Sequence, residues 1–335
     1  MLPYASLTAG LLTIAALAQA DKPQSPLEPS QGDAPPILGF GTWNLKVSPS
    51  NTTEAVSLAI QEGYRHIDCA AAYGNEEAVG KGIAEGLEKA GLKREDIWVT
   101  SKLWNDHHGK LNKVEEGLNK TLKDLGVGYL DLYLMHWPVG GSSKLDYDYI
   151  KTWHSMEKLP LLGTVRNIGV SNFSPHQLKK LIKKSSIKPA VHQMELHPYL
   201  QQKGWVELHQ EHGIHVTAYS PLGNSNPTYR SSSRAANTHK TPPLLLENEA
   251  LAKIADMRNC TTAQVALAWG MQRGTSVIPK TSHAKWIKEN FESVTCGLVD
   301  TDVDKIEELG KKYLTRFNKP GRSWGVKLFE GLDDA

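Results

Sequence analysis

The stretch GYRHIDCAAAYGNE, residues 63–76, brings a strand signal, a carboxylate and a tyrosine close together in the chain. A short run at 66–68 ends on Asp68, small residues follow, and Tyr73 comes just before a helical pattern that begins at Glu76. Tyrosine is a poor acid at neutral pH because its ordinary pKa is about 10, so a tyrosine that gives up a proton needs a cation beside it. A lysine paired with a buried carboxylate would supply that cation. The stretch therefore predicts one strand-to-helix unit with reactive groups where the strand ends.

The same unit recurs along the chain. Apolar residues at spacings of three and four predict helices over 53–62, 76–89, 110–125, 149–158, 175–184, 204–212, 248–257, 262–273 and 302–309. Short β-rich runs lie at 37–43, 66–68, 98–102, 130–136, 165–170, 190–195, 215–219 and 276–279. Strict alternation predicts a parallel sheet, and eight units predict that this sheet closes on itself. The expected fold class is α/β, as a single (β/α)8 TIM barrel.

Two later strands also end on polar residues. The run WVTSK at 98–102 ends on Lys102, and the run LDLYLMH at 130–136 ends on His136. In a barrel of this kind the loops after the strands share one face, and that face holds the active site. We therefore expect Asp68, Tyr73, Lys102 and His136 to meet at one mouth of the barrel.

At these residues the chain resembles the aldo-keto reductases. The blocks DCAAAYGNE (68–76), SKLW (101–104) and HWP (136–138) match that family, in family order, at the positions of its catalytic tetrad. The resemblance implies that Tyr73 is the general acid and that Lys102 lowers its pKa by charge. It implies that Asp68 holds the lysine and that His136 donates a hydrogen bond to the substrate oxygen. The family has the same barrel fold, which is a separate argument for it.

The resemblance also implies a nicotinamide coenzyme. Tyr219 matches the tyrosine that stacks on the nicotinamide ring, and Ser171, Asn172 and Gln193 match the groups that hold its carboxamide. The segment IPKT at 278–281 resembles the site for the 2′-phosphate of NADPH, with Lys280 and Thr281 placed ahead of a helix. The remaining positions that match coenzyme contacts are Gly41, Thr42, Asp68, Ser220, Leu222, Glu289 and Asn290.

One coenzyme position departs from the family pattern. The family usually has an arginine six residues after the lysine of the phosphate site, and this chain has Trp286 there. Lys285 and Lys288 are neighbouring cations that would compensate for the missing arginine. We therefore expect NADPH as the coenzyme and keep NADH as the alternative.

Aromatic residues follow several of the expected strands. Trp43, Trp104 and Trp137 would form the walls of an apolar substrate pocket, with His136 at its polar end. The C-terminal segment at 324–330 resembles the family segment that helps to set substrate choice. A long loop at 224–243, rich in Ser, Asn and Thr, is expected to close over the coenzyme.

These features predict an NADPH-dependent aldo-keto reductase that reduces aldehydes, ketones or sugar carbonyls to alcohols. The alternatives are a polyol or alcohol dehydrogenase that works mainly in oxidation, and a coenzyme-binding regulatory barrel without significant turnover. The expected partner is a small carbonyl substrate, and the chain is expected to be a monomer. The net charge is only +2 and is dispersed along the chain, so we expect no binding to nucleic acid. His209, His212 and His215 lack an HExxH pattern, so no metal is expected.

The N-terminus is unlike the rest of the chain. Residues 1–20 carry no formal charge and end in Ala-Gln-Ala, the small-x-small pattern of a secretory cleavage site. Their apolar part is too short and too interrupted for a stable membrane span. We therefore expect a signal peptide at 1–20, a disordered leader at 21–36 and the barrel at 37–335. This arrangement predicts the secretory pathway or the extracellular space, with the cytoplasm as the alternative. Of the three cysteines, Cys69 is expected to be a packed thiol.

Overall fold

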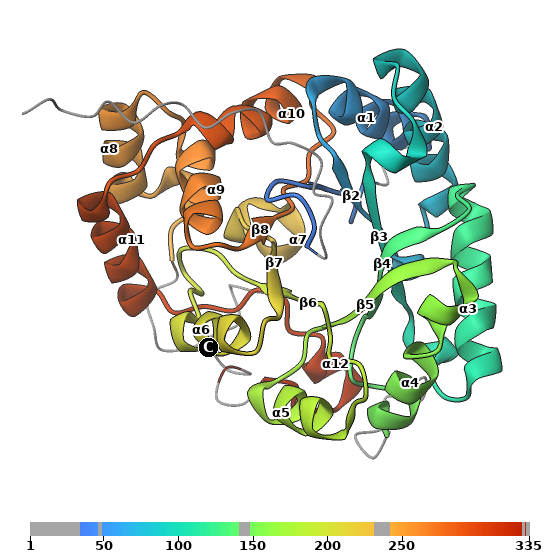
Figure 1. Cartoon of the computed structure of the whole chain (residues 1–335). Coiled ribbons are helices and arrows are strands. Elements are labelled where there is room, and N and C mark those ends of the chain that lie inside the picture. The colour runs from blue at the N-terminus through green and yellow to red at the C-terminus, as the bar shows by residue number, and fades with distance from the viewer. Residues whose placement is uncertain (1–33, 46–48, 141–147, 231–241, 330–331, 333–335) are drawn as a thin grey trace, which may run out of the picture.

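The computed structural model describes residues 34–45, 49–140, 148–230, 242–329 and 332. Eight parallel strands lie side by side in the order in which they occur in the chain, with helices arranged around them (Figure 1). Each strand pairs with its neighbours in sequence, as in the register of His66 with Trp98 and of Thr100 with Leu132. The strands are β1 (Phe40–Gly41), β2 (His66–Asp68), β3 (Trp98–Leu103), β4 (Leu130–Met135), β5 (Val165–Ser171), β6 (Val191–Glu195), β7 (His215–Tyr219) and β8 (Ser276–Val277).

Backbone hydrogen bonds between the first and last strands close the sheet. The amide of Gly39 donates to the carbonyl of Val277 at 2.9 Å, and the amide of Val277 donates to the carbonyl of Ile37 at 2.9 Å. Farther along, Gly41 N donates to the carbonyl of Pro279 at 3.0 Å. The predicted (β/α)8 barrel is therefore confirmed. It also follows that the carboxyl ends of all the strands open on one mouth.

The helices follow the predicted alternation. They are α1 (Pro49–Glu62), α2 (Glu76–Ala90), α3 (Leu111–Leu125), α4 (Tyr149–Met156), α5 (Pro175–Lys184), α6 (Lys203–Glu211), α7 (Pro227–Arg230), α8 (Glu249–Arg258), α9 (Thr262–Gln272), α10 (Ala284–Phe291), α11 (Asp300–Lys312) and α12 (Gly321–Trp324). Ser174 and Thr261 cap α5 and α9 with capping boxes. The helix α1 begins at Pro49 rather than at Thr53, because proline is well tolerated in the first turn of a helix.

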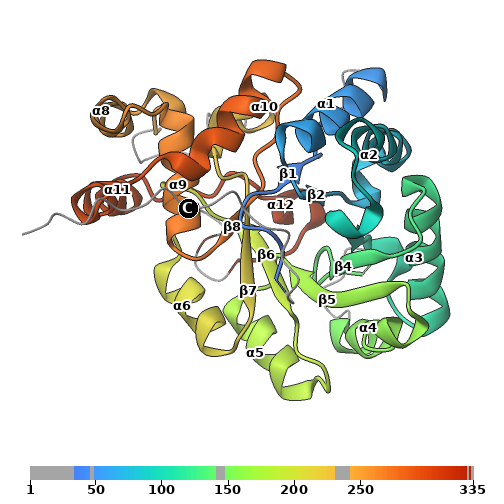
Figure 2. The same cartoon turned by 45° about the horizontal axis from the view of Figure 1, so that its top comes forward.

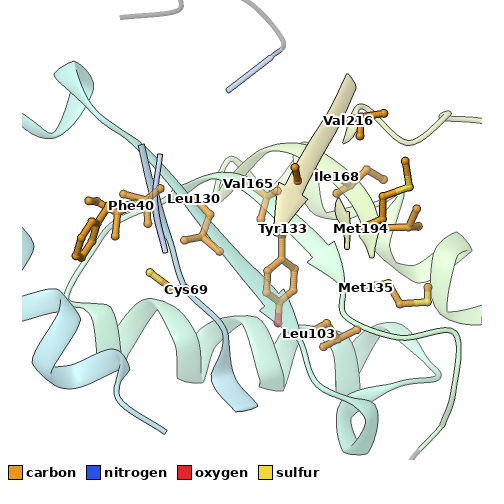
Figure 3. Packing of buried hydrophobic residues seen from close by; sticks show 14 of the residues in the cluster. Phe40, Cys69, Leu103, Leu130, Tyr133, Met135, Val165, Ile168, Met194 and Val216 are labelled. Atoms are coloured by element: carbon orange, nitrogen blue, oxygen red, sulfur yellow. The ribbon is translucent and has the colours of Figure 1, made fainter. Parts of the chain in front are cut away.

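The main core lies around the barrel strands and under the helices that cover them. Figure 3 shows Tyr133 of β4 packed among buried side chains that include Leu130, Leu103 and Cys69. A second cluster of buried apolar residues fills the space under α8, α9 and α11. There α8 and α11 lie next to each other at one edge of the molecule (Figure 2). Helix α9, which this second cluster supports, contacts both β8 and α10.

The cysteines divide into one free thiol and one disulfide. Cys69 is fully buried and free, as predicted, and burial raises the pKa of its thiol well above the ordinary value. Cys260, just after α8, and Cys296 form a disulfide, with a Cα–Cα distance of 6.1 Å. The disulfide therefore links the start of α9 to the segment that follows α10.

Some expectations fall on parts of the chain that the structure does not describe. They are the signal peptide at 1–20, all but the last three residues of the leader at 21–36, and residues 231–241 of the long loop. In the ranges that are described, no helix combines the length and the hydropathy required to cross a bilayer. In those same ranges no group of three or more His, Cys, Asp or Glu side chains is placed to hold a metal ion.

Glu76, at the start of α2, is a buried carboxyl group with two neutral hydrogen-bond donors. It accepts a hydrogen bond from Ser101 Oγ at 2.7 Å and one from Thr121 Oγ1 at 3.2 Å. Burial raises the pKa of the Glu76 carboxyl to about 7. The protonated Glu76 carboxyl contributes about 3 kcal/mol to the free energy of unfolding. This contribution is fully present below the ordinary glutamate pKa and is lost as the pH rises through about 7.

We predict that Glu76→Gln unfolds at a higher urea concentration than the wild type at pH 8, and at nearly the same concentration at pH 5.

The matched control is Glu77→Gln, because Glu77 is the next residue of the same helix and its side chain is exposed. This control variant should follow the wild type at both pH values. Equal urea midpoints for Glu76→Gln and wild type at pH 8 would show that the buried carboxyl group does not titrate near neutrality.

Candidate active site

A cavity of about 850 Å³ opens at the carboxyl ends of the strands. Most of the side chains that the sequence singled out line it, and they come from several different strands. They are Gly41, Trp43, Asp68, Tyr73, Trp104, His136, Trp137, Ser171, Asn172, Gln193, Tyr219, Ser220, Leu222, Lys280, Thr281, Glu289 and Asn290. Thr42 does not line the cavity. It is fully buried behind the wall, where its hydroxyl donates to the carbonyl of Asp68 at 2.8 Å.

Lys102 lies beneath the cavity floor and joins two of the expected catalytic residues. Its Nζ donates to Asp68 Oδ1 at 2.6 Å, to the carbonyl of Cys69 at 2.8 Å and to the Tyr73 hydroxyl at 3.1 Å. Lys102 and Asp68 are both almost completely buried. All three protons of the ammonium group are therefore used, and one of them is directed at the tyrosine oxygen.

The pKa of the Tyr73 hydroxyl depends on more than the charge of Lys102. Burial raises the pKa of the Tyr73 hydroxyl well above the ordinary value, and the negative charge of Asp68 acts in the same direction. Because Asp68 lies 2.6 Å from the ammonium group, the tyrosine faces an ion pair rather than a free cation. The phenol is therefore held protonated across neutral pH, which suits a proton donor. The lysine remains placed to stabilise the phenolate that forms when the proton leaves.

His136 lies directly beside Tyr73 in the cavity. Its ring meets the Tyr73 ring edge-on at 5.9 Å between centroids and meets Trp104 at 5.2 Å. Burial lowers the pKa of His136 well below the ordinary value, and the charge of Lys102 adds to this effect. A neutral imidazole donates from one ring nitrogen only. His136 Nδ1 is buried and has no hydrogen-bond partner among the residues that the structure describes, so it does not open on the cavity, and Nε2 is the ring nitrogen left to meet a substrate.

Asn172 is held in an uncommon backbone conformation at the end of β5. Its φ of 62° is in the left-handed region, which residues other than glycine seldom adopt. Its amide donates to the carbonyl of His136 at 3.0 Å and to Ser171 Oγ at 2.9 Å. Its Oδ1 accepts a hydrogen bond from the Tyr219 hydroxyl at 2.7 Å. The polar groups expected at the nicotinamide end are therefore one connected set.

Gln193 makes a contact that the sequence did not reveal. Its amide donates to Asp68 Oδ2 at 2.6 Å, so both carboxylate oxygens of Asp68 are occupied, one by Lys102 and one by Gln193. Strand β6 lies across the barrel from β2 and is separated from it in sequence by more than a hundred residues. Only the closed barrel brings the two side chains together.

Lys280 lines the cavity at the end away from Tyr73. Its side chain is partly buried, which lowers the pKa of its ammonium group, and among the described residues no carboxylate pairs with it. Thr281 accepts a hydrogen bond from the backbone amide of His283, just ahead of α10. Trp286 lies on the first turns of that helix, half-exposed and edge-on to the ring of His283 at 4.3 Å. An unpaired lysine and a hydroxyl ahead of a helix form a site suited to a phosphate group.

The comparisons with known proteins decide the family. The sequence model of the Aldo/keto reductase family matches residues 37–311. The chain belongs to the aldo/keto reductase family. An uncharacterized oxidoreductase of Schizosaccharomyces pombe is 46% identical over 321 residues, which cover 91% of this chain and 94% of that protein. The NAD(P)H-dependent D-xylose reductase I,II of Candida tropicalis is 38% identical over 88% of this chain and 94% of that protein.

A solved structure gives the same result. The aldo-keto reductase of Bombyx mori in complex with NADP superimposes on this chain with a TM-score of 0.77 and 34% identity, covering 88% of this chain and 94% of that one. The family resemblance seen in the sequence is therefore confirmed. This aldo/keto reductase is an NAD(P)H-dependent oxidoreductase.

Four tryptophans form the apolar walls of the reductase cavity. Trp324 meets Trp137 edge-on at 5.1 Å and Trp104 at 6.2 Å, and these three cluster beside His136. Trp43 packs on Tyr229 at 5.6 Å on another wall. The predicted grouping of Trp43, Trp104 and Trp137 around one pocket is therefore observed, and the C-terminal segment adds Trp324 to it.

The sequence pattern did not predict several of the residues at the reductase cavity. Tyr229 and Asn318 line it, and Glu195 lies buried behind Tyr219 and Asn318. Tyr229 belongs to a four-residue helix, and its hydroxyl lies 3.0 Å from Ser220 Oγ. No local pattern marks these residues, and the partners of Asn318 and Glu195 are about a hundred residues away in sequence. The one available signal was the position of Glu195 at the end of a predicted strand.

Proposed function

We propose that this reductase converts aldehydes, ketones or sugar carbonyls to alcohols, with Tyr73 as the general acid. The observation that carries the proposal is the placement of Lys102 Nζ between Asp68 Oδ1 and the Tyr73 hydroxyl, at 2.6 and 3.1 Å, under a cavity with apolar walls. A buried ammonium group in this place stabilises a phenolate directly, and a proton donor at the floor of a pocket acts on a substrate oxygen inside it.

Each group has its own role in the proposed reduction. Reduced nicotinamide, when bound, supplies the hydride to the carbonyl carbon. Tyr73 gives its proton to the carbonyl oxygen, and Lys102 stabilises the phenolate that is left. His136, which burial keeps neutral, donates a hydrogen bond to the same oxygen from Nε2. The tryptophan walls exclude water and favour aromatic or aliphatic substituents.

The side chains present fit a nicotinamide dinucleotide. Asn172 and Gln193 carry amide groups at the end of the cavity where Tyr73 lies, and Tyr219 offers a ring face there. Lys280 and Thr281 would hold a phosphate group, and Glu289 and Asn290 would contact the adenine. Two polar ends joined by an apolar cavity match a ligand with a carboxamide at one end and a phosphorylated adenosine at the other. We propose NADPH as the coenzyme, with NADH as the alternative.

The turnover experiment uses the chain from residue 21. We expect consumption of NADPH with small aromatic, aliphatic or sugar aldehydes, and slower consumption of NADH. Stronger oxidation of polyols than reduction of any aldehyde at neutral pH would favour the dehydrogenase alternative. Tight coenzyme binding without turnover in either direction would favour the regulatory barrel. Size-exclusion chromatography with light scattering would test the proposed monomer.

Trp286 is expected to limit the preference for NADPH. Substituting Trp286→Arg places a second cation near Lys280, and a charge-assisted hydrogen bond to the 2′-phosphate would raise the ratio of NADPH to NADH affinity about tenfold. The dissociation constants are measured by quenching of protein fluorescence. The control Trp286→Leu removes the ring without adding charge and should give no such gain. A ratio in the arginine variant equal to that of the leucine variant would place the phosphate away from residue 286.

We also propose that the chain enters the secretory pathway. The pattern at 1–20 supports this, and the Cys260–Cys296 disulfide adds support because disulfides persist mainly in oxidising compartments. Expression of the full chain in a eukaryotic host should yield a protein that begins at Asp21. Recovery of peptides from residues 1–20 in the cytosolic fraction would contradict the proposal.

A further inference from the structure

Glu195, at the last position of β6, is a fully buried carboxylate that the mechanism above does not use. Its oxygens accept hydrogen bonds from His197 Nε2 at 2.9 Å, from Phe317 N at 2.7 Å and from Asn318 N at 2.9 Å. The guanidinium of Arg316, also buried, lies 3.6 Å away. Three successive residues of the C-terminal segment are therefore attached to one side chain of the barrel.

The charges around Glu195 keep it ionised. Burial alone would raise the pKa of the Glu195 carboxyl, but the hydrogen bond from His197 and the charge of Arg316 lower it below the ordinary value. Two backbone amides need an acceptor with two free oxygens, and only a carboxylate offers them in this place. An amide side chain would turn one of these oxygens into a donor that faces another donor.

The segment that Glu195 holds reaches the cavity through Asn318. The Asn318 amide donates to the Tyr219 hydroxyl at 3.0 Å, and that hydroxyl donates to Asn172 Oδ1 at 2.7 Å. Asn318, Tyr219 and Asn172 all line the cavity. A continuous chain of hydrogen bonds therefore runs from Glu195 through the C-terminal segment to Asn172, which also holds the carbonyl of His136.

We propose that Glu195 and Asn318 are positioning residues for the nicotinamide half of the coenzyme site. Glu195 fixes Asn318, and Asn318 fixes the ring of Tyr219 and, through it, the amide of Asn172. The inference rests on the proposed coenzyme site, and it adds that the C-terminal segment and the nicotinamide end are coupled. The adenosine end, around Lys280 and α10, has no part in this chain of hydrogen bonds.

This separation gives a direct test. Binding of NADPH is compared with binding of 2′,5′-ADP, which has the adenosine end but lacks nicotinamide, in Glu195→Gln and Asn318→Ala. Both variants should bind NADPH about tenfold more weakly than the wild type, as expected for the loss of one hydrogen bond to an ordered partner. Both should bind 2′,5′-ADP within about twofold of the wild type, because that end is untouched. The double variant should lose no more affinity for NADPH than the more strongly affected single variant.

The control is Thr315→Ala, in the same segment, because the Thr315 hydroxyl donates to the carbonyl of Tyr313 and Thr315 does not line the cavity. Its NADPH affinity should equal that of the wild type. Glu195→Gln risks misfolding, and if Glu195→Gln is not recovered, Asn318→Ala alone decides the test.

Unchanged NADPH binding in Asn318→Ala overturns the proposal. An equal loss of affinity for NADPH and 2′,5′-ADP also overturns it, because such a loss indicates general damage. A wild-type chain that binds 2′,5′-ADP and NADPH equally well also overturns it, whereas one that binds neither refutes the coenzyme site itself.

Discussion

Replacing Tyr73 with phenylalanine is expected to lower turnover by about 10²–10⁴-fold, the usual contribution of a general acid. The change removes one hydroxyl group and leaves the ring in contact with His136. Lys102 keeps its hydrogen bonds to Asp68 and to the carbonyl of Cys69, so the buried ion pair survives. The variant should therefore fold and bind coenzyme as the wild type does. Steady-state rates with an aldehyde, together with the dissociation constant of NADPH, separate these effects.

The matched control for this change is Tyr133→Phe. Tyr133 is also a buried tyrosine at a barrel strand, but it belongs to the core and does not line the cavity (Figure 3). Its turnover per folded molecule should remain close to the wild-type value. If Tyr73→Phe keeps turnover within about tenfold of the wild type, the proton comes from another group, because the loss of a general acid has a larger effect.

The sequence was sufficient to predict the barrel and the residues that meet at its mouth. Helix and strand periodicities are local, and eight alternating units leave few arrangements other than a closed parallel sheet. Once the sheet closes, Asp68, Lys102 and His136 must lie at the same end, because each lies at or directly beside the carboxyl end of a strand. The positions of the strand ends thus determine the site, although β1 and β8 are shorter than their patterns indicated.

What the sequence could not predict depends on contacts between distant segments. Glu195 binds Phe317, 122 residues later, and Gln193 binds Asp68, 125 residues earlier. No periodicity marks such pairs. The net direction of the pKa shift of Tyr73 could not be predicted from the sequence for a related reason. The charge of Lys102 is evident from the sequence, whereas the burial of the hydroxyl and the neutralising effect of Asp68 appear only after folding.

The cavity divides into two ends with different physical supports. The end that we propose for the nicotinamide is built on strand ends and on the C-terminal segment through Tyr219, Asn172 and Asn318. The end that we propose for the adenosine is built on α10, which Gln264 of α9 contacts by donating to the carbonyl of Glu289, and on the region that the Cys260–Cys296 disulfide ties together. Changes at one end should therefore alter affinity for one half of a dinucleotide more than for the other.

Substitutions in the Lys102–Asp68 pair should have the largest effects on stability. Both side chains are at most 1% exposed, and their charged atoms lie 2.6 Å apart. Among the described residues, Lys102→Met leaves the buried Asp68 carboxylate with only the amide of Gln193 as partner, and Asp68→Asn leaves the ammonium group without an anion. Each single variant should lose about 3–5 kcal/mol in the free energy of unfolding, because an isolated charge remains in the interior.

The double variant Lys102→Met/Asp68→Asn should behave differently, because neither charge is left behind. Its loss of stability should be smaller than the sum of the two single losses, since replacing both members of a buried ion pair is often nearly neutral. Turnover should be abolished in both single variants and in the double variant, because none of them keeps a cation beside the Tyr73 hydroxyl in a fixed position.

Urea unfolding and steady-state rates measured on the same preparations distinguish the role of the pair in stability from its role in catalysis. Additive losses of stability would mean that the two residues contribute independently, and turnover in the double variant would mean that Tyr73 donates its proton without the lysine.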